Sequence, residues 1–204
     1  MLTKLSIVTF QRIVALASGT GSLFKALALS KDSTGGEVVA LVSDADIPAV
    51  AIAYELGIPV YVVPMHADRS VWDTRMTNLL TSLNPDLIVS AGFMRILGPK
   101  VVERFEGKII NCHPALLPDF PGAHAVQDAL NAGVATTGGT VHYIDAGVDT
   151  GPVIAQVEVA IMPNDTESTL HERIKIRERA LLVDVVRDIL AGKIRYEGGE
   201  VIKV

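Results

Sequence analysis

The amino-acid sequence predicts an α/β fold, an open, mostly parallel, twisted sheet with helices on both faces. Short β-branched runs alternate with amphipathic helical stretches over most of the 204 residues, which is typical of a parallel sheet covered by helices. Apolar residues form 49% of the chain, enough to build a sizeable core. Neither a repeat nor a linker interrupts the pattern. We therefore expect a single domain that spans residues 1–204.

The first half of the chain predicts four strands, each followed by a helix. The strands are expected at residues 12–17, 37–43, 60–63 and 87–90, and the helices at 21–29, 48–57, 69–83 and 99–105. Pro48 suits the first turn of its helix, and Gly57 ends it. The third helix has four large side chains spaced to lie on one face: Trp72, Met76, Leu79 and Leu83. The Asn-Pro-Asp segment at 84–86 breaks this helix.

The second half of the chain predicts three further strands and two helices. The strands are expected at residues 108–112, 137–143 and 152–158. Three prolines make residues 114–121 a structured loop, and the helix that follows at 122–132 stops at Gly133. Asp165 or Thr166 can cap a last helix that runs to about residue 190. Its expected buried stripe consists of Leu170, Ile174, Leu181 and Val185.

Composition and charge exclude several classes of protein. The formal net charge of −5 argues against a general nucleic-acid binder, which would need a basic surface. The single cysteine excludes a disulfide scaffold, and the histidines show no metal-ligand spacing. No apolar run reaches the roughly 18 residues that a membrane span needs, and the first residues lack the pattern of a secretory signal. We expect a cytoplasmic protein with no metal and no nucleic-acid or membrane partner.

A glycine turn follows the first predicted strand. Ser18-Gly-Thr-Gly-Ser22 lies where an open α/β sheet places its phosphate site, because glycines let the backbone approach an anion at a helix start. Phe24 occupies the position where a dinucleotide fingerprint needs its third small residue, and no Walker lysine is present. The pattern therefore favours a phosphate monoester over NAD or ATP. The alternative is a tight strand-to-helix connection without a ligand.

An amide and an imidazole end the fifth predicted strand. Asn111 and His113 are two residues apart and share a face, whereas Cys112 points to the opposite side, into the core. At the carboxyl end of a parallel strand, this pair suits acyl transfer: the amide donates to a developing oxyanion and the imidazole moves a proton. The alternative is that Asn111 caps the turn and His113 only packs.

A carboxylate lies in a glycine-rich loop further along the chain. Asp149 belongs to the segment Asp145-Ala-Gly-Val-Asp-Thr-Gly-Pro152, which lacks the alternating oxygen ligands of a calcium loop. Asp149 is either an ordinary turn residue or the carboxylate that pairs with His113, raises the pKa of the imidazole and orients the ring.

Together these segments resemble the folate-dependent formyltransferases. The resemblance is carried by Asn111-Cys-His-Pro-Ala-Leu-Leu-Pro118, Pro121-Gly-Ala-His124 and Asp149-Thr-Gly-Pro152, and it runs from about residue 12 to 190. The glycine turn and Ala91-Gly-Phe-Met-Arg-Ile-Leu97 are similar to the branch that formylates glycinamide ribonucleotide in de novo purine biosynthesis. The resemblance implies a Rossmann-like formyltransferase fold, with a phosphate-binding half at about 12–105 and a catalytic, folate-binding half at about 106–190.

The resemblance also implies the substrates and the role of each residue. The formyl donor would be 10-formyltetrahydrofolate, the acceptor glycinamide ribonucleotide, and no metal would take part. The implied catalytic residues are Asn111, His113 and Asp149, with protonated His113 and Asn111 stabilising a tetrahedral oxyanion. Gly21, Ser22 and Leu23 are implied to bind the phosphate of the acceptor, and Glu178 is implied to bind its ribose hydroxyls. The implied folate-binding residues are Arg69, Met94, Arg95, Ile96, Leu97, Asn111, Ile144 and Val148.

Two positions depart from the family pattern. Leu23 stands where many relatives have Asn, and Val126 stands where some members have a second histidine, which weakens a catalytic role for His124. Both implied binding residues also have a purely structural alternative. Arg69 would be a solvated charge at a helix start, and Glu178 would only pair with Arg177 or Arg179.

Other functions and a self-association also fit parts of the sequence. Formyltetrahydrofolate hydrolases usually add an N-terminal regulatory domain, and methionyl-tRNA formyltransferases add a C-terminal barrel and a basic surface; neither feature is found in these 204 residues. A non-catalytic nucleotide-binding module explains the glycine turn but not the catalytic trio. Apolar segments at 2–10 and 202–204 are either a homodimer contact or frayed ends.

Overall fold

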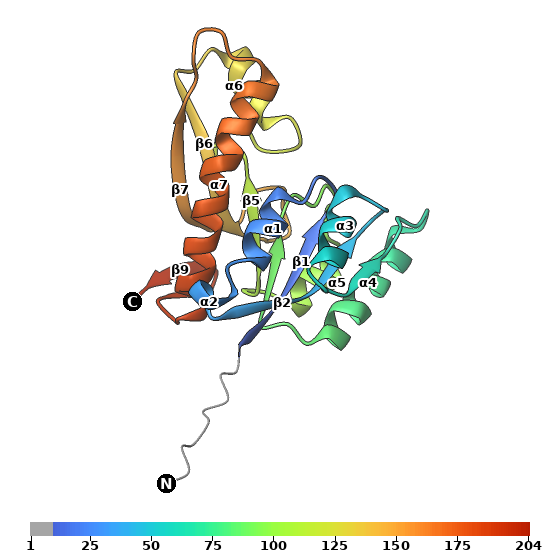
Figure 1. Cartoon of the computed structure of the whole chain (residues 1–204). Coiled ribbons are helices and arrows are strands. Elements are labelled where there is room, and N and C mark those ends of the chain that lie inside the picture. The colour runs from blue at the N-terminus through green and yellow to red at the C-terminus, as the bar shows by residue number, and fades with distance from the viewer. Residues whose placement is uncertain (1–9) are drawn as a thin grey trace.

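The computed structural model describes residues 10–204 and is built on a seven-stranded sheet (Figure 1). The strand order is β3-β2-β1-β4-β5-β6-β7. The first five strands run parallel: β1 (Gln11–Ala17), β2 (Gly36–Ser43), β3 (Val60–Val62), β4 (Leu87–Ser90) and β5 (Ile109–His113). The antiparallel pair β6 (Thr136–Tyr143) and β7 (Val153–Ala160) extends the sheet beyond β5. Residues 2–9 of the N-terminal segment suggested as a dimer contact lie outside the described residues.

Helices cover both faces of the sheet and bury a separate core on each. On one face lie α1 (Ser22–Ala28), α3 (Pro48–Glu55) and the long α7 (Glu167–Leu190), over β-branched and leucine side chains. On the other face, α4 (Arg69–Leu83) and α5 (Pro99–Arg104) pack around the fully buried Trp72. Alternate residues of a strand serve the two cores: Ile110 and Cys112 face the first, and Ile109 faces the second. The predicted α/β architecture is confirmed.

Local sequence signals fix several element boundaries. The Asp68 carboxylate accepts a hydrogen bond from the Ser70 N–H and caps α4, which ends where Asn84 adopts a left-handed conformation with φ of 47°. Thr166, one of the two expected caps, starts α7 through a reciprocal capping box with Thr169. These contacts explain why both helices begin within two residues of their predicted starts.

The structure also corrects parts of the predicted secondary structure. The helix expected from Gly122 begins later, as α6 (Ala125–Ala132), and the buried stripe of α7 uses Leu182 where Leu181 was expected. A short α2 (Lys31–Thr34) precedes β2. The chain ends in a hairpin of β8 (Ile194–Glu197) and β9 (Glu200–Lys203), so residues 202–203 are paired, not frayed.

The sheet topology places the ligand edge. The strand order reverses between β1 and β4, since β2 and β3 lie on one side of β1 and the later strands lie on the other. In open α/β sheets, ligands bind beyond the carboxyl ends of the strands at such a reversal. Within residues 10–204, no helix is both long and apolar enough to cross a membrane.

Candidate active site

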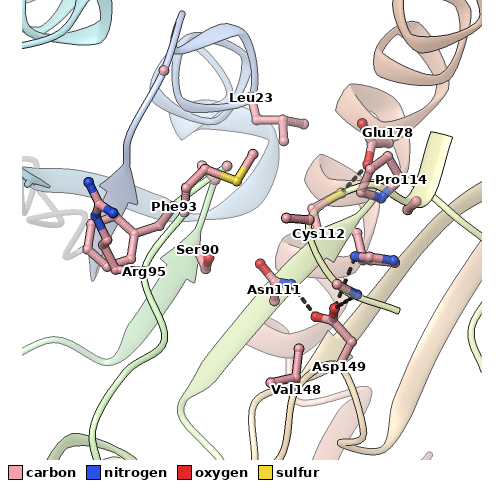
Figure 2. Close-up of a pocket in the computed structure, with 18 of the residues that line it drawn as sticks. Leu23, Ser90, Phe93, Arg95, Asn111, Cys112, Pro114, Val148, Asp149 and Glu178 are labelled. Carbon is pink, nitrogen blue, oxygen red and sulfur yellow. Dashed lines mark hydrogen bonds and ion pairs between the residues drawn. The ribbon is translucent and has the colours of Figure 1, made fainter. Parts of the chain in front are cut away.

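A cavity of about 580 Å³ opens at the carboxyl ends of β1, β4 and β5, where the topology predicts a ligand site. It collects side chains that are far apart in the sequence (Figure 2). All the site residues expected from the sequence but one line it: Gly21, Ser22, Leu23, Met94, Arg95, Ile96, Leu97, Asn111, His113, Ile144, Val148, Asp149 and Glu178. The exception is Arg69.

The three expected catalytic side chains meet around the Asp149 carboxylate. One carboxylate oxygen, Oδ2, lies 3.4 Å from His113 Nδ1 and accepts a 2.8 Å hydrogen bond from the Gly122 N–H. The other, Oδ1, accepts a 3.4 Å hydrogen bond from the Asn111 amide (Figure 2). Strand β5 thus carries both the amide and the imidazole on one face, and the loop after β6 brings the carboxylate to them.

A second histidine, His142, completes this cluster. Its Nδ1 donates to the Tyr143 carbonyl at 2.8 Å, so its Nε2 faces the Asn111 amide at 3.2 Å and Asp149 Oδ1 at 3.5 Å. When neutral, His142 accepts from Asn111; when protonated, it donates to Asp149. His142 is not among the site residues that the sequence predicts. Its place in the site follows from strand pairing, because the antiparallel register of β5 and β6 puts His142 directly opposite Asn111.

The two nitrogens of the His113 ring are held from opposite sides. Nε2 donates to the Phe120 carbonyl at 2.8 Å, and Nδ1 faces Asp149. Phe120 and Asp149 both have left-handed backbones, with φ of 54° and 55°. Such conformations in non-glycine residues cost on the order of 1–3 kcal/mol and persist where the surroundings enforce them, often at functional sites. The fold therefore fixes the orientation of this imidazole.

Burial and neighbouring groups shift the pKa values of both Asp149 and His113. A hydrogen bond from His142, together with the Gly122 N–H and the charge of His113, lowers the pKa of Asp149 to about 2, although burial acts in the opposite direction. Burial lowers the pKa of His113, and this outweighs the raising effects of the Phe120 hydrogen bond and the Asp149 charge. Asp149 therefore raises the pKa of His113 as expected, but burial has the larger effect, so the net pKa of the imidazole lies below its ordinary value.

The glycine turn forms another wall of the cavity. Gly21 has φ of 78°, and a Cβ there would lie 2.6 Å from that of Ala49, so only glycine fits. Helix α1 starts at Ser22, and no side chain caps it. The N–H groups of its first turn are thus left without a side-chain partner beside the cavity.

Three contacts fix the loop after β4, which includes Met94, Arg95 and Ile96. The Met94 N–H donates to Ser18 Oγ at 3.0 Å, and Arg95 Nε donates to the buried Asp44 carboxylate at 2.6 Å. Arg69 donates to the Ile96 carbonyl at 2.5 Å and lies over the Trp72 ring. Arg69 is therefore a solvent-exposed residue at the start of α4 that does not line the cavity but supports residues that do.

Glu178 enters the cavity from α7 as a buried carboxyl. It is 2% exposed, and within residues 10–204 it forms no ion pair with Arg177, Arg179 or any other cation. Its Oε1 accepts a 3.5 Å hydrogen bond from the Cys112 thiol. Burial raises the pKa of Glu178 to about 7, and the Cys112 hydrogen bond acts in the opposite direction. The part of the chain that the structure describes gathers no group of three or more His, Cys, Asp or Glu that could hold a metal ion.

Comparison with known proteins assigns the family. A family model described as formyl transferase matches residues 11–186. The chain is 51% identical over 181 residues to the phosphoribosylglycinamide formyltransferase of Mycobacterium tuberculosis (strain CDC 1551 / Oshkosh), which covers 86% of this chain and 83% of that protein. The chain belongs to the formyl transferase family. The resemblance found in the sequence is confirmed.

Solved structures of the formyl transferase family agree with this assignment. The crystal structure of glycinamide ribonucleotide transformylase 1 from Symbiobacterium toebii superposes with a TM-score of 0.92 at 31% identity, over 100% of this chain and 98% of that one. A formyltetrahydrofolate deformylase from Pseudomonas syringae pv. tomato str. DC3000 gives a TM-score of 0.88 at 24% identity, over 96% of this chain and 66% of that one. At that identity, the second likeness shows the fold alone.

Proposed function

We propose that this protein transfers the formyl group of 10-formyltetrahydrofolate to the amine of glycinamide ribonucleotide, a step of de novo purine biosynthesis. The convergence of Asn111, His113 and Asp149 in the cavity beside the glycine turn carries this proposal. It joins an oxyanion donor, a proton carrier and a counter-ion next to a wall suited to a phosphate monoester. The 51% identity to a named phosphoribosylglycinamide formyltransferase supports the same reaction.

The reaction begins when the amine of the ribonucleotide attacks the formyl carbon. A C–N bond forms and the formyl oxygen becomes an oxyanion, to which the Asn111 amide donates. His113 Nδ1, the ring nitrogen that does not donate to Phe120, takes the proton that the amine loses by way of the Asp149 carboxylate that it faces, and the re-ionised Asp149 stabilises the imidazolium. The tetrahedral intermediate then collapses, N10 of the folate leaves, and His113 returns the proton to it. The products are formylglycinamide ribonucleotide and tetrahydrofolate, so neither a covalent enzyme intermediate nor a metal is needed.

The two substrates enter from different walls of the cavity. The phosphate of the ribonucleotide binds the backbone N–H groups at Gly21, Ser22 and Leu23, which is consistent with the loss of an asparagine side chain at position 23. Its ribose hydroxyls donate to Glu178. The folate lies against Met94–Leu97, Ile144 and Val148, where apolar side chains such as Met94 and Ile96 are exposed.

Dependence on the acceptor amine tests this function. We expect consumption of 10-formyltetrahydrofolate only when glycinamide ribonucleotide is present, with one formylated product for each tetrahydrofolate released. Equal consumption without the acceptor would assign the protein as a hydrolase. Tight ligand binding with background consumption would assign it as a non-catalytic module.

The proposal extends to partners and compartment. The partners are the two small-molecule substrates, because the net charge of −5 disfavours nucleic acid. The single cysteine is buried and unpaired, which fits a reducing cytoplasm. The phosphate-binding half at about 12–105 and the catalytic half at about 106–190 act as one domain. A homodimer remains a prediction that a measurement of mass in solution would test.

A further inference from the structure

The buried face of the catalytic strand carries a group that the proposed mechanism does not use. Cys112 lies between Asn111 and His113 on β5 but points to the opposite side of the sheet, toward α7. Cys112 is 6% exposed, and its thiol donates to Glu178 Oε1 at 3.5 Å (Figure 2). The sequence predicts only a place in the core for this cysteine.

The Glu178 side chain packs against a glycine on the neighbouring strand. Across from α7, Gly139 on β6 leaves room for it, because a Cβ at that position would lie 2.7 Å from Glu178 Cγ. Glu178 lines the cavity, yet the Cys112 thiol is the only described group that hydrogen-bonds to it. Among the described residues Oε2 has no hydrogen-bond partner, and it is not sealed off by the protein, so it is open to a donor from a ligand in the cavity.

Opposing effects set the protonation state of Glu178: burial favours the protonated form, and nearby donors and cations favour the ionised form. Lys175 and Arg179, on its own helix, act at a distance and favour the ionised form, as the Cys112 hydrogen bond does. The residue of β6 that faces Glu178 is Gly139, which carries no charge. The one charged residue of α1, Lys25, is exposed to solvent. Among residues 10–204, Cys112 is thus the single neutral donor that hydrogen-bonds to the carboxylate.

We propose that Cys112 is a positioning residue, whose thiol holds Glu178 as the ionised acceptor that the ribose hydroxyls of glycinamide ribonucleotide require. An ionised carboxylate only accepts hydrogen bonds, so it can take the thiol on one oxygen and ribose hydroxyls on the other. A protonated Glu178 would donate one proton and lose part of this capacity. The inference rests on the proposed function, because it takes the ribonucleotide as the ligand.

The test compares Cys112→Ala, which removes the donor, with Cys112→Ser, which keeps one. For Cys112→Ala we expect KM for glycinamide ribonucleotide to rise about three- to tenfold at pH 7, the scale of one ordinary hydrogen bond, since a thiol is a weak donor. The rise should vanish near pH 9, where Glu178 is ionised without help, and kcat should change little. Cys112→Ser should follow the wild type. A purely structural defect would raise KM at every pH.

A ligand-free measurement separates the inference from the proposed function. In a carbon-13 NMR titration of labelled glutamate, assigned with Glu178→Gln, the Glu178 carboxyl of Cys112→Ala should titrate at higher pH than in wild type. Identical titrations in these two proteins would overturn the inference, whatever the enzyme does. If the titration shifts but Glu178→Gln leaves KM for the ribonucleotide unchanged, the ribose role of Glu178 is wrong instead.

Discussion

At the scale of single residues, the site depends on which protonation state each buried group adopts. Donors around Asp149 hold the pKa of its carboxyl at about 2, whereas burial of His113, which is 4% exposed, lowers the pKa of its imidazole. A neutral imidazole next to a carboxylate can accept a proton and is then stabilised as the cation. The burial of the imidazole and the carboxylate that faces it together suit a residue that gains charge during the reaction.

This view predicts the acid side of the pH profile. Since burial lowers the pKa of His113, kcat should fall as the pH drops through a value below 6.5 and should form a plateau above it. The measurement is kcat at saturating concentrations of both substrates, which separates His113 from the effect of Glu178 on KM. A kcat that instead declines as pH rises through neutrality would show that protonated His113 is the active form.

At the scale of elements, three contacts hold the loop after β4 in place for the folate. All three reach the loop from other parts of the chain, through Arg69 on α4, Asp44 just after β2 and Ser18 just after β1. The Asp44 side chain is 4% exposed, so its ion pair with Arg95 is shielded from solvent on one side. The contacts of Arg69 and Asp44 are not visible in local sequence patterns, because the partners are 27 and 51 positions apart.

Loosening this loop should weaken folate binding without stopping the chemistry. For Arg69→Ala and Asp44→Asn we expect KM for 10-formyltetrahydrofolate to rise about tenfold, the scale of one charge-assisted hydrogen bond, with kcat close to wild type. Arg75→Ala is the matched control, since Arg75 is an exposed arginine on the same helix. Equal KM values in the three variants would mean that the loop keeps its shape without these contacts.

Elements with strong local signals were predictable, and those that depend on partners were not. The bounds of α4 and β4 agree with the prediction, since a capping Asp68 and the Asn-Pro-Asp break mark them in the sequence. The β8–β9 hairpin was missed although Gly198 and Gly199 form its turn with positive φ, because it is short. Its packing depends on distant Tyr143, which Tyr196 contacts at 5.0 Å between ring centroids.

The same distinction holds for the site. The motifs around Asn111 and Asp149 predicted that these residues act together, and they share the cavity. The role of His142 required the β5–β6 register, and the net direction of the pKa of His113 required its burial. Both are properties of the folded chain, so a single sequence contains no local signal for them.

At the scale of the whole molecule, the site reduces the stability of the fold. Glu178 lies in the sheet–α7 interface, where burial raises its pKa from 4.5 to about 7. A raised carboxyl pKa means that folding favours the protonated form. The associated stability is complete below about pH 4.5 and is lost as the pH rises through 7.

The free energy of unfolding should therefore depend on pH through this residue. Between pH 5 and 8 the wild type should lose on the order of 3 kcal/mol relative to Glu178→Gln, because one pKa unit corresponds to about 1.4 kcal/mol. Urea unfolding of both proteins at the two pH values measures the difference. Parallel pH dependence in the two proteins would show that Glu178 titrates normally in the fold.

The most direct test of the account is the turnover of Asp149→Asn, compared with His113→Ala, in the transfer of formyl from 10-formyltetrahydrofolate to glycinamide ribonucleotide. Both variants should stay folded by circular dichroism, and kcat should fall at least ~10²–10³-fold, the scale of losing one group that stabilises the transition state. Near-wild-type turnover in either folded variant would contradict the assignment of this cluster as the catalytic site.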